Sequence, residues 1–382
     1  MKYLVKNTLY IIFILFIGFL NKINAQQVLS EIKIIKEVPT TSVKNQSRTG
    51  TCWSFGTTSF IETELIRMGK GEIGLSEMFT VRCAYDYHAE MYIRYHGHIN
   101  FTMGAQAWDL FRVIKDYGIV PREVYPGLRI NPKIHDHREM DKVLEAIANT
   151  LVEQKSISPV WREAYNGVLD GYLGKYPAEF EYKGKKYTPE SFRDYLGINV
   201  DDFETFTSFT HHPYNTEFVF ESPDNWSNGI VKNVSMDHLI QIIDNALNNG
   251  YSVVWASDVS DKGFNHAKGL AIVPEKDWDE MSEQEKAEAF EKPVKQRKIT
   301  PEMRQAEYNN YGTTDDHLMH IIGLAEDSNG TKYYKVKNSW GTEGNTLGGF
   351  FYASESYVRY RTMTIVTHKN AVPKEILQKF EK

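Results

Sequence analysis

The predicted fold is built around Val43-Lys44-Asn45-Gln46-Ser47-Arg48-Thr49-Gly50-Thr51-Cys52-Trp53-Ser54-Phe55-Gly56. A glycine-bearing turn delivers Cys52 to the start of an apolar run, whose side chains continue at helical spacing: Phe55, Ser59, Glu62 and Ile66. We therefore expect Cys52 in the first turn of a buried helix. A helix N-terminus carries partial positive charge and unpaired N–H groups, which favour a thiolate and can receive an oxyanion. Gln46 offers an amide N–H to the same place.

The cysteine has two interpretations. Free cysteines are among the most buried residue types, so Cys52 taken alone is explained equally well as a core residue and as a nucleophile. The surrounding run closely resembles the active-site segment of the papain superfamily of cysteine peptidases. That resemblance implies that Cys52 is the nucleophile and that the Gln46 amide stabilises the oxyanion. Residues 47–51 lack the superfamily's usual first glycine and structural cysteine but keep the spacing.

A thiolate nucleophile needs a base, and the base needs a group that orients it. Residues 316–341 read as two antiparallel strands joined by an Asp-Ser-Asn-Gly turn, which places His317 and Asn338 near the same end of the pair. Asn338 can accept the imidazole N–H, and Trp340 can shield that hydrogen bond from water. His320 competes for the role of base, but it lies three residues along the strand and therefore faces the opposite side.

Further motifs narrow the resemblance to bleomycin hydrolase and the bacterial aminopeptidases C. They are Leu75-Ser76-Glu77, Gln106-Ala107-Trp108 through Pro121, Tyr125-Pro126, Trp255 to Val259, His317-Leu318-Met319 and Asn338-Ser339-Trp340-Gly341. The resemblance assigns the base to His317 and the orienting group to Asn338.

The same resemblance suggests substrate-binding groups. In the papain superfamily a glycine-containing loop lends backbone groups to the peptide, and Gly104 matches its position loosely; a plain helix entry explains Gly104 equally well. Trp340 is expected beside the substrate. In the narrower family the C-terminal arm enters the cleft of a hollow hexamer, and its carboxylate holds the substrate's α-ammonium. For this chain that implies a homo-oligomer and an arm at about 373–382, with the Lys382 carboxylate as the anchor.

The resemblance implies a papain-like α+β fold with two lobes. A helical lobe carries Cys52, and an antiparallel sheet lobe carries His317 and Asn338. We expect one peptidase domain over residues 26–382, with a helical insertion at about 136–235 and a polar surface excursion at about 275–300.

The N-terminal segment predicts export. The chain has 382 residues, and residues 1–25 begin with Lys2 and Lys6, continue with an apolar run from Leu9 to Leu20 and end at Ala25. This pattern is typical of a secretory signal peptide, and the run is too short to span a bilayer. We therefore expect a periplasmic or extracellular protein without stable membrane anchoring. An uncleaved anchor is the alternative.

Charge and composition limit the partners. Loss of residues 1–25 removes three lysines and no acid, so the net charge changes from −6 to −9. An acidic surface argues against nucleic acid or anionic lipid as the main partner. Cys52 and Cys83 are expected to be free thiols. Histidine pairs such as His211-His212 have no third and fourth ligand at useful spacing, so we expect neither a metal nor another cofactor.

The predicted function is a cysteine aminopeptidase. A Cys52 thiolate paired with a His317 imidazolium would cleave peptides through a thioester acyl-enzyme. An endopeptidase with an open cleft and a catalytically silent peptide-binding protein are the alternatives. A transglutaminase-like acyl transferase ranks last, because such enzymes typically orient the base with Asp rather than Asn.

Overall fold

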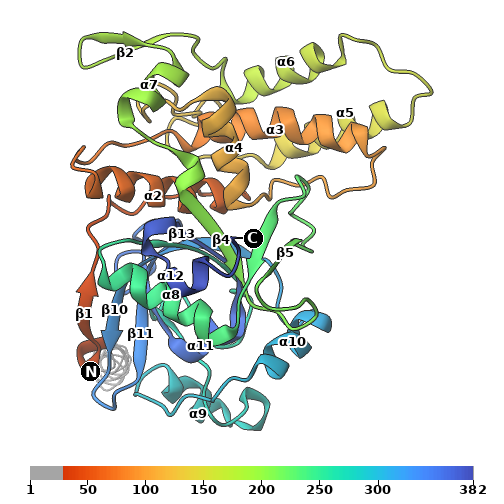
Figure 1. Ribbon diagram of the computed structural model, residues 1–382. Helices are drawn as coiled ribbons and strands as arrows, with labels where there is room; N and C mark the ends of the chain where they lie inside the picture. Colours follow the sequence, from red (N-terminus) through yellow and green to blue (C-terminus); the bar gives the residue numbers. More distant parts are fainter. Residues whose placement is uncertain (1–28, 382) are drawn as a thin grey trace, which may run out of the picture.

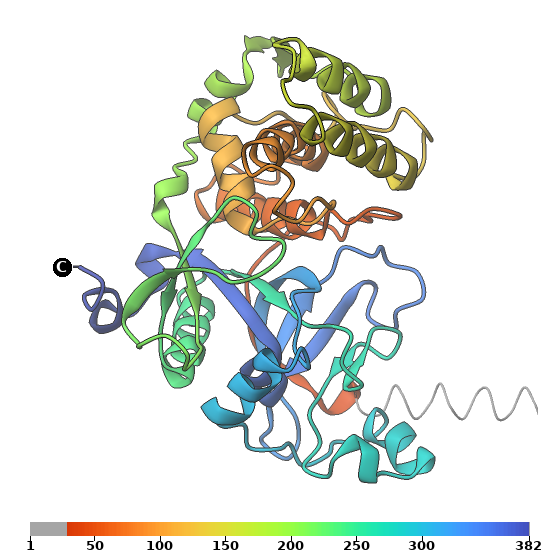
Figure 2. The same cartoon turned by 90° about the vertical axis from the view of Figure 1, so that its right-hand side faces the viewer.

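The computed structural model describes residues 29–381, which form a helical lobe and a sheet lobe (Figures 1 and 2). The expected α+β class is therefore confirmed. The predicted signal peptide and Lys382 lie outside the described residues.

The helical lobe is built around the helix that begins at Cys52. Its helices are α2 (Cys52–Arg67), α3 (Glu77–Arg94), α4 (Ala107–Tyr117), α5 (Arg138–Val152), α6 (Trp161–Leu173) and α7 (Pro189–Leu196). Helix α3 begins directly after Ser76, because the Ser76 hydroxyl accepts the Phe79 N–H at 3.0 Å as an N-cap. Helix α3 packs against α2, α4, α5 and α6. A separate short hairpin is formed by β2 (Phe180–Tyr182) and β3 (Lys185–Tyr187).

The sheet lobe holds one large mixed sheet. Its strand order is β5-β6-β4-β13-β7-β10-β11-β12-β9-β8, and β1 pairs with β10. The strands are β1 (Lys33–Glu37), β4 (Phe203–Thr207), β5 (Thr216–Val219), β6 (Ile230–Asn233), β7 (Val253–Ser257), β8 (Phe264–Asn265), β9 (Leu270–Ala271), β10 (His317–Glu326), β11 (Lys332–Lys337), β12 (Phe350–Ser354) and β13 (Thr362–His368). The surrounding helices are α8 (Met236–Asn248), α9 (Glu283–Ala289), α10 (Pro301–Asn309), α11 (Glu355–Arg361) and α12 (Lys374–Leu377), with short 3₁₀ turns at η1 (Val200–Asp202), η2 (Trp278–Glu280) and η3 (Lys369–Ala371).

The segment 136–235 is divided between the lobes. Helices α5, α6 and α7 extend the helical lobe. Strands β4 and β6 instead join the main sheet, where β4 pairs with β13 and β6 pairs with β4. Describing the segment as a helical insertion is therefore correct only for its first part. The second part contributes short strands, of which β4 pairs with β13 along the edge that β7 leaves open.

The predicted β10–β11 hairpin is confirmed. The two strands are antiparallel, with His320 opposite Lys337. His317 and Asn338 therefore lie at the same end of the pair, as expected.

The C-terminal arm does not line the pocket described below. The Asn245 side chain donates to the Ala371 carbonyl at 2.7 Å, Ile376 is buried, and Phe380 packs against Phe206 with ring centroids 6.3 Å apart. Residues 374–381 therefore do not follow the path into the cleft that the resemblance implies, because their apolar side chains pack on α8 and β4. The predicted role of the Lys382 carboxylate falls on an undescribed residue.

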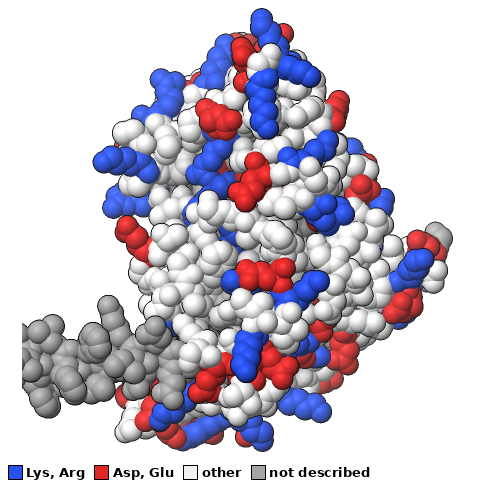
Figure 3. Space-filling view, turned by 90° about the vertical axis from the view of Figure 1, so that its left-hand side faces the viewer, with Lys and Arg blue, Asp and Glu red and all other residues white. Residues whose placement is uncertain are grey.

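The outer surface is of mixed charge. On the face shown in Figure 3, basic and acidic side chains are interspersed and form no continuous basic field. Among the described helices, none is long and apolar enough to cross a membrane.

The two lobes meet most closely where α2 crosses β10. Gly56 lies one turn after Cys52, and a Cβ at this position would stand 2.6 Å from Leu318 Cδ2 and 2.9 Å from the Leu318 carbonyl oxygen. Leu318 directly follows His317. The absence of a side chain at Gly56 therefore sets the distance between the helix of Cys52 and the strand of His317.

We predict that Gly56→Ala destabilises the protein by about 1–3 kcal/mol, because the added methyl group meets backbone that cannot rotate away. Gly167→Ala in α6 is the matched control, since its Cβ would meet nothing within 4 Å. Its helix propensity should stabilise the protein by about 0.5–1 kcal/mol. Urea denaturation of both variants measures the difference; equal effects would contradict this account of the lobe contact.

Candidate active site

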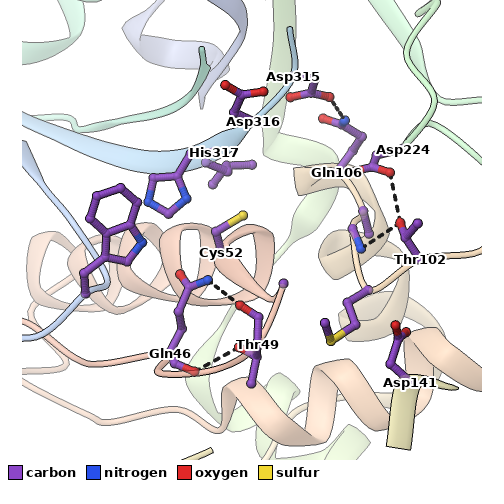
Figure 4. Close-up of a pocket in the computed structure, with 16 residues that line it drawn as sticks. Gln46, Thr49, Cys52, Thr102, Gln106, Asp141, Asp224, Asp315, Asp316 and His317 are labelled. Atoms are coloured by element: carbon purple, nitrogen blue, oxygen red, sulfur yellow. Dashed lines mark hydrogen bonds between the residues drawn. The ribbon is translucent and has the colours of Figure 1, made fainter. Parts of the chain in front are cut away.

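A pocket of about 400 Å³ lies between the lobes and contains the predicted nucleophile and base (Figure 4). Both lobes contribute to its walls. The lining residues are Gln46, Thr49, Gly50, Cys52, Thr102, Met103, Gly104, Ala105, Gln106, Asp141, Asp224, Asp315, Asp316, His317, Leu318 and Trp340.

Cys52 is the first residue of α2, as predicted, and is partly exposed to the pocket. Cys52 and Cys83 are both free thiols. In Figure 4 the Cys52 side chain lies between His317 on one side and Gln106, Asp224 and Asp315 on the other. The sulfur therefore faces the space between His317 and the two aspartates, where a substrate could bind.

His317 is held in one orientation. Its Nε2 is 2.7 Å from Asn338 Oδ1, so Nε2 carries the proton and Nδ1 is left for the thiol. The Trp340 ring covers the imidazole, with centroids 4.6 Å apart. The geometry places all three residues as the sequence predicts.

His320 faces away from the pocket. Its Nδ1 lies 2.9 Å from the Ser59 hydroxyl, and the ring is fully buried. Burial and the nearby Lys337 charge hold the pKa of His320 well below its ordinary value. His320 is therefore a neutral core residue of β10 whose side chain packs against α2.

Gln46 is positioned by the segment that follows Asn338. Its backbone N–H donates to the Ser339 carbonyl at 2.8 Å, and its Oε1 accepts the Ser339 hydroxyl at 2.6 Å. These bonds orient the amide so that Nε2 faces the pocket, where one of its two hydrogens goes to the Thr49 carbonyl at 2.8 Å. The second hydrogen remains for an oxyanion.

The backbone groups of Gly104 have partners within the protein. Its N–H donates to the Thr102 hydroxyl at 3.2 Å, and its carbonyl accepts the Trp226 indole N–H at 3.0 Å. Both backbone groups are therefore engaged within the protein. A Cβ at Gly104 would stand 1.9 Å from Asp224 Oδ2, so the glycine makes room for that carboxylate.

Asp224 and Asp315 form an acidic wall that sequence reasoning missed. Asp224 Oδ1 accepts from Asn100 at 2.7 Å and from Thr102 at 3.1 Å. Asp315 Oδ2 accepts from Gln106 and, at 2.8 Å, from Ser222. The second oxygen of each carboxylate has no partner among the described residues. None of the described lining residues is Lys or Arg.

The surroundings of Cys52 and His317 shift the pKa values of both groups away from the expected ion pair. Burial raises the pKa of Cys52 to about 12, and the Asp315 and Asp224 charges act in the same direction. Burial lowers the pKa of His317 to about 4, against the opposing effect of its bond to Asn338. Both shifts favour the neutral thiol and the neutral imidazole over the thiolate–imidazolium pair.

His266 is a further residue that sequence reasoning missed. Its Nδ1 lies 3.3 Å from Asn338 Nδ2, and its ring meets Trp340 edge-on at 4.8 Å. His266 therefore supports the group that orients the base. It lies far from Asn338 in the sequence, and no local motif links the two.

Comparisons with known proteins agree with this geometry. Residues 175–382 match a family model described as "Peptidase C1-like family", and residues 31–167 match one described as "Papain family cysteine protease". The aminopeptidase C of Lactococcus lactis subsp. cremoris is 24% identical over 89% of this chain and 83% of its own. The aminopeptidase C of Listeria monocytogenes is 23% identical over 94% of this chain and 86% of its own length.

A solved structure shows the same fold. PepW from Lactobacillus rhamnosis superposes with a TM-score of 0.69 at 21% identity, over 91% of this chain and 84% of its own. The expected fold and family are thus confirmed. Because the match to the "Peptidase C1-like family" model over residues 175–382 covers more than half of the chain, the chain belongs to that family.

Proposed function

We propose that this protein is a cysteine aminopeptidase. The observation that carries the proposal is the oriented His317–Asn338 pair beside Cys52, in a pocket whose far wall is acidic. Relatives that match most of the chain are named aminopeptidases C, G, W and E.

The reaction follows from the positions of these groups. The neutral His317 takes the Cys52 proton, and the sulfur attacks the peptide carbonyl. The backbone N–H of Cys52 and the Gln46 amide receive the oxyanion. His317 then protonates the leaving amine, and a thioester remains. Water activated by His317 releases the first residue of the peptide and restores the thiol.

An aminopeptidase must also hold the free α-ammonium group. Backbone geometry places that nitrogen about 2.5 Å from the scissile carbonyl carbon. The anion that binds it must therefore lie close to the nucleophile. Asp224 and Asp315 line the same pocket as Cys52, and the charges of both carboxylates raise the pKa of its thiol. We assign the anchor to these two residues.

The anchor would also activate the nucleophile. The charges of the two carboxylates oppose formation of the Cys52 thiolate. A bound ammonium group neutralises their field, which lowers the pKa of the thiol when a substrate with a free amino terminus is present. The expected thiolate–imidazolium pair then belongs to the substrate complex rather than to the free enzyme.

The alternatives lead to different products. An endopeptidase would use the acidic wall for a Lys or Arg side chain and would accept blocked peptides. A silent peptide-binding protein would bind peptides without turnover, although it would have no use for Gln46, Cys52, His317 and Asn338 together. For its location, the pattern of residues 1–25 supports export to the periplasm or beyond.

We predict that His317→Gln reduces kcat to the level of Cys52→Ala, because the thiol loses its base. His320→Gln is the matched control. It should lower thermal stability by disturbing the contact with Ser59, yet keep kcat within about threefold, since His320 faces the core. Steady-state kinetics and thermal unfolding separate the two. Loss of kcat in both variants at unchanged stability would contradict the assignment of the base.

We predict cleavage of aminoacyl fluorogenic substrates and little cleavage of their N-acetylated forms. Burial and the Asp224 charge raise the pKa of Asp315 to about 6, so this carboxylate is charged above that pH and neutral below it. The kcat/KM for free-amine substrates should therefore fall as the pH drops through about 6. Equal rates on free and blocked peptides would favour the endopeptidase.

We predict that Asp315→Asn and Asp224→Asn each lower one measured rate and raise another. The kcat/KM for free-amine substrates should fall by about tenfold or more, because a charged hydrogen bond to the ammonium is lost. Alkylation of Cys52 by uncharged iodoacetamide should become faster, because a negative charge that opposes the thiolate is gone. Slower alkylation together with lower activity would indicate structural damage, and unchanged kinetics would remove these residues from the anchor.

A further inference from the structure

A second cluster of ligand-type side chains lies on the sheet lobe. His211 and His212 follow β4, and Glu221 follows β5, so the β4–β5 connection brings together residues that the sequence does not pair. One ligand atom from each residue lies within 4.8 Å of the others. His211 Nε2 is 2.5 Å and His212 Nε2 is 3.2 Å from the two oxygens of the same carboxylate.

The hydrogen bonds of His211 leave its second nitrogen without a matching partner. The Gln305 oxygen accepts the Thr210 and His211 backbone N–H groups at 2.6 and 3.2 Å, while its nitrogen donates to Asn309, so the orientation of this amide is fixed. His211 Nδ1 lies 3.2 Å from that oxygen and must therefore donate to it. In a neutral ring, Nε2 then presents a lone pair to the Glu221 carboxylate. Two acceptors face each other unless a proton or a cation lies between them.

Neighbouring aromatic rings hold both imidazoles in place. His212 stacks on Phe218 with centroids 4.0 Å apart, and His211 stacks on Tyr308 at 5.5 Å. The Tyr308 hydroxyl donates to the Glu221 carbonyl, which fixes the third residue. Such support orients ligands before a cation arrives and reduces the entropy lost on binding.

We propose that His211 Nε2, His212 Nε2 and the Glu221 carboxylate bind a divalent transition-metal cation of the zinc class. Two imidazoles and one carboxylate suit Zn²⁺ better than Ca²⁺ or Mg²⁺, which prefer oxygen ligands, and water would complete the coordination.

The cation would connect the turn at 211–212 to the segment that carries Asp224. Glu221 is followed by Ser222, whose hydroxyl donates to Asp315 at 2.8 Å. The cluster also borders a cavity of about 460 Å³ whose lining includes His211, Glu221, Asp224 and Asp315, so this cavity shares its two aspartates with the catalytic pocket. The cation would therefore stabilise the position of the segment that carries Asp224 without contacting Cys52 or His317.

The test uses the full chain in a Cys52→Ala background, because a Cys52–His317 pair can itself bind zinc. After treatment with a chelator, calorimetry with Zn²⁺ should give one site per chain, and bound Zn²⁺ should raise the Tm. His212→Ala and Glu221→Gln, each in the same background, should weaken binding by at least about tenfold and abolish the Tm shift. Co²⁺ should give the visible absorption of a low-coordinate site.

The exposed His98 supplies the control, and His98→Ala should bind Zn²⁺ like the background variant. The conservative Glu221→Gln keeps the size of the side chain, and circular dichroism checks that it is folded. Absence of binding to the background variant would overturn the proposal, and a proton would then be the group between His211 Nε2 and the Glu221 carboxylate. Binding that persists equally in His212→Ala and Glu221→Gln would also overturn it, since the cation would then sit elsewhere.

Discussion

The close approach of α2 to β10 is the constraint on which the rest of the structure depends. Helix α2 carries the sulfur and β10 carries the imidazole, and the two elements belong to different lobes. Their separation is set where Gly56 lies against Leu318, one turn from Cys52 and one residue from His317. The Ser59–His320 bond and the backbone bond between Gln46 and Ser339 lock the same contact from two further sides. Because the pocket opens beside this contact, a small change in packing would change the distance between nucleophile and base.

The same tight packing has an electrostatic cost. Burial favours the uncharged forms of both Cys52 and His317, and the Asp224 and Asp315 charges increase the preference of Cys52 for the thiol. On the proposed function, this cost gives selectivity. A substrate with a free amino terminus brings the positive charge that the pocket lacks, so binding and activation arise from one interaction. A blocked peptide places no charge there and leaves the thiol protonated.

The sequence was informative where chemistry is concentrated in short motifs. Local patterns predict Cys52 at a helix start and the His317–Asn338 pair at one end of a hairpin, and the structure has both in these positions. Local patterns did not predict contacts between residues that are far apart in the sequence and are brought together only by the fold. Asp224 and Asp315 reach the pocket from two separate loops, and His266 reaches Asn338 from a third segment. Glu221 meets His211 across a strand connection. The docking of the C-terminal arm was also missed, because whether Phe380 finds the cleft or the surface of β4 is a question of tertiary packing.

The position of that arm bears on how an exopeptidase can be built. The physical requirement is a negative charge at a fixed short distance from the nucleophile, and any carboxylate held there satisfies it. A chain terminus meets it only if the arm crosses the pocket, whereas here residues 374–381 pack on α8 and β4. Side-chain carboxylates on the loops at 224 and 315 supply a charge from the pocket wall instead, and Gly104 provides the space that Asp224 needs. An anchor built into the wall leaves the rest of the cleft open, so substrate length would be limited by the Asp224–Asp315 side alone. On this account the aminopeptidase activity resides in two side chains rather than in the end of the chain.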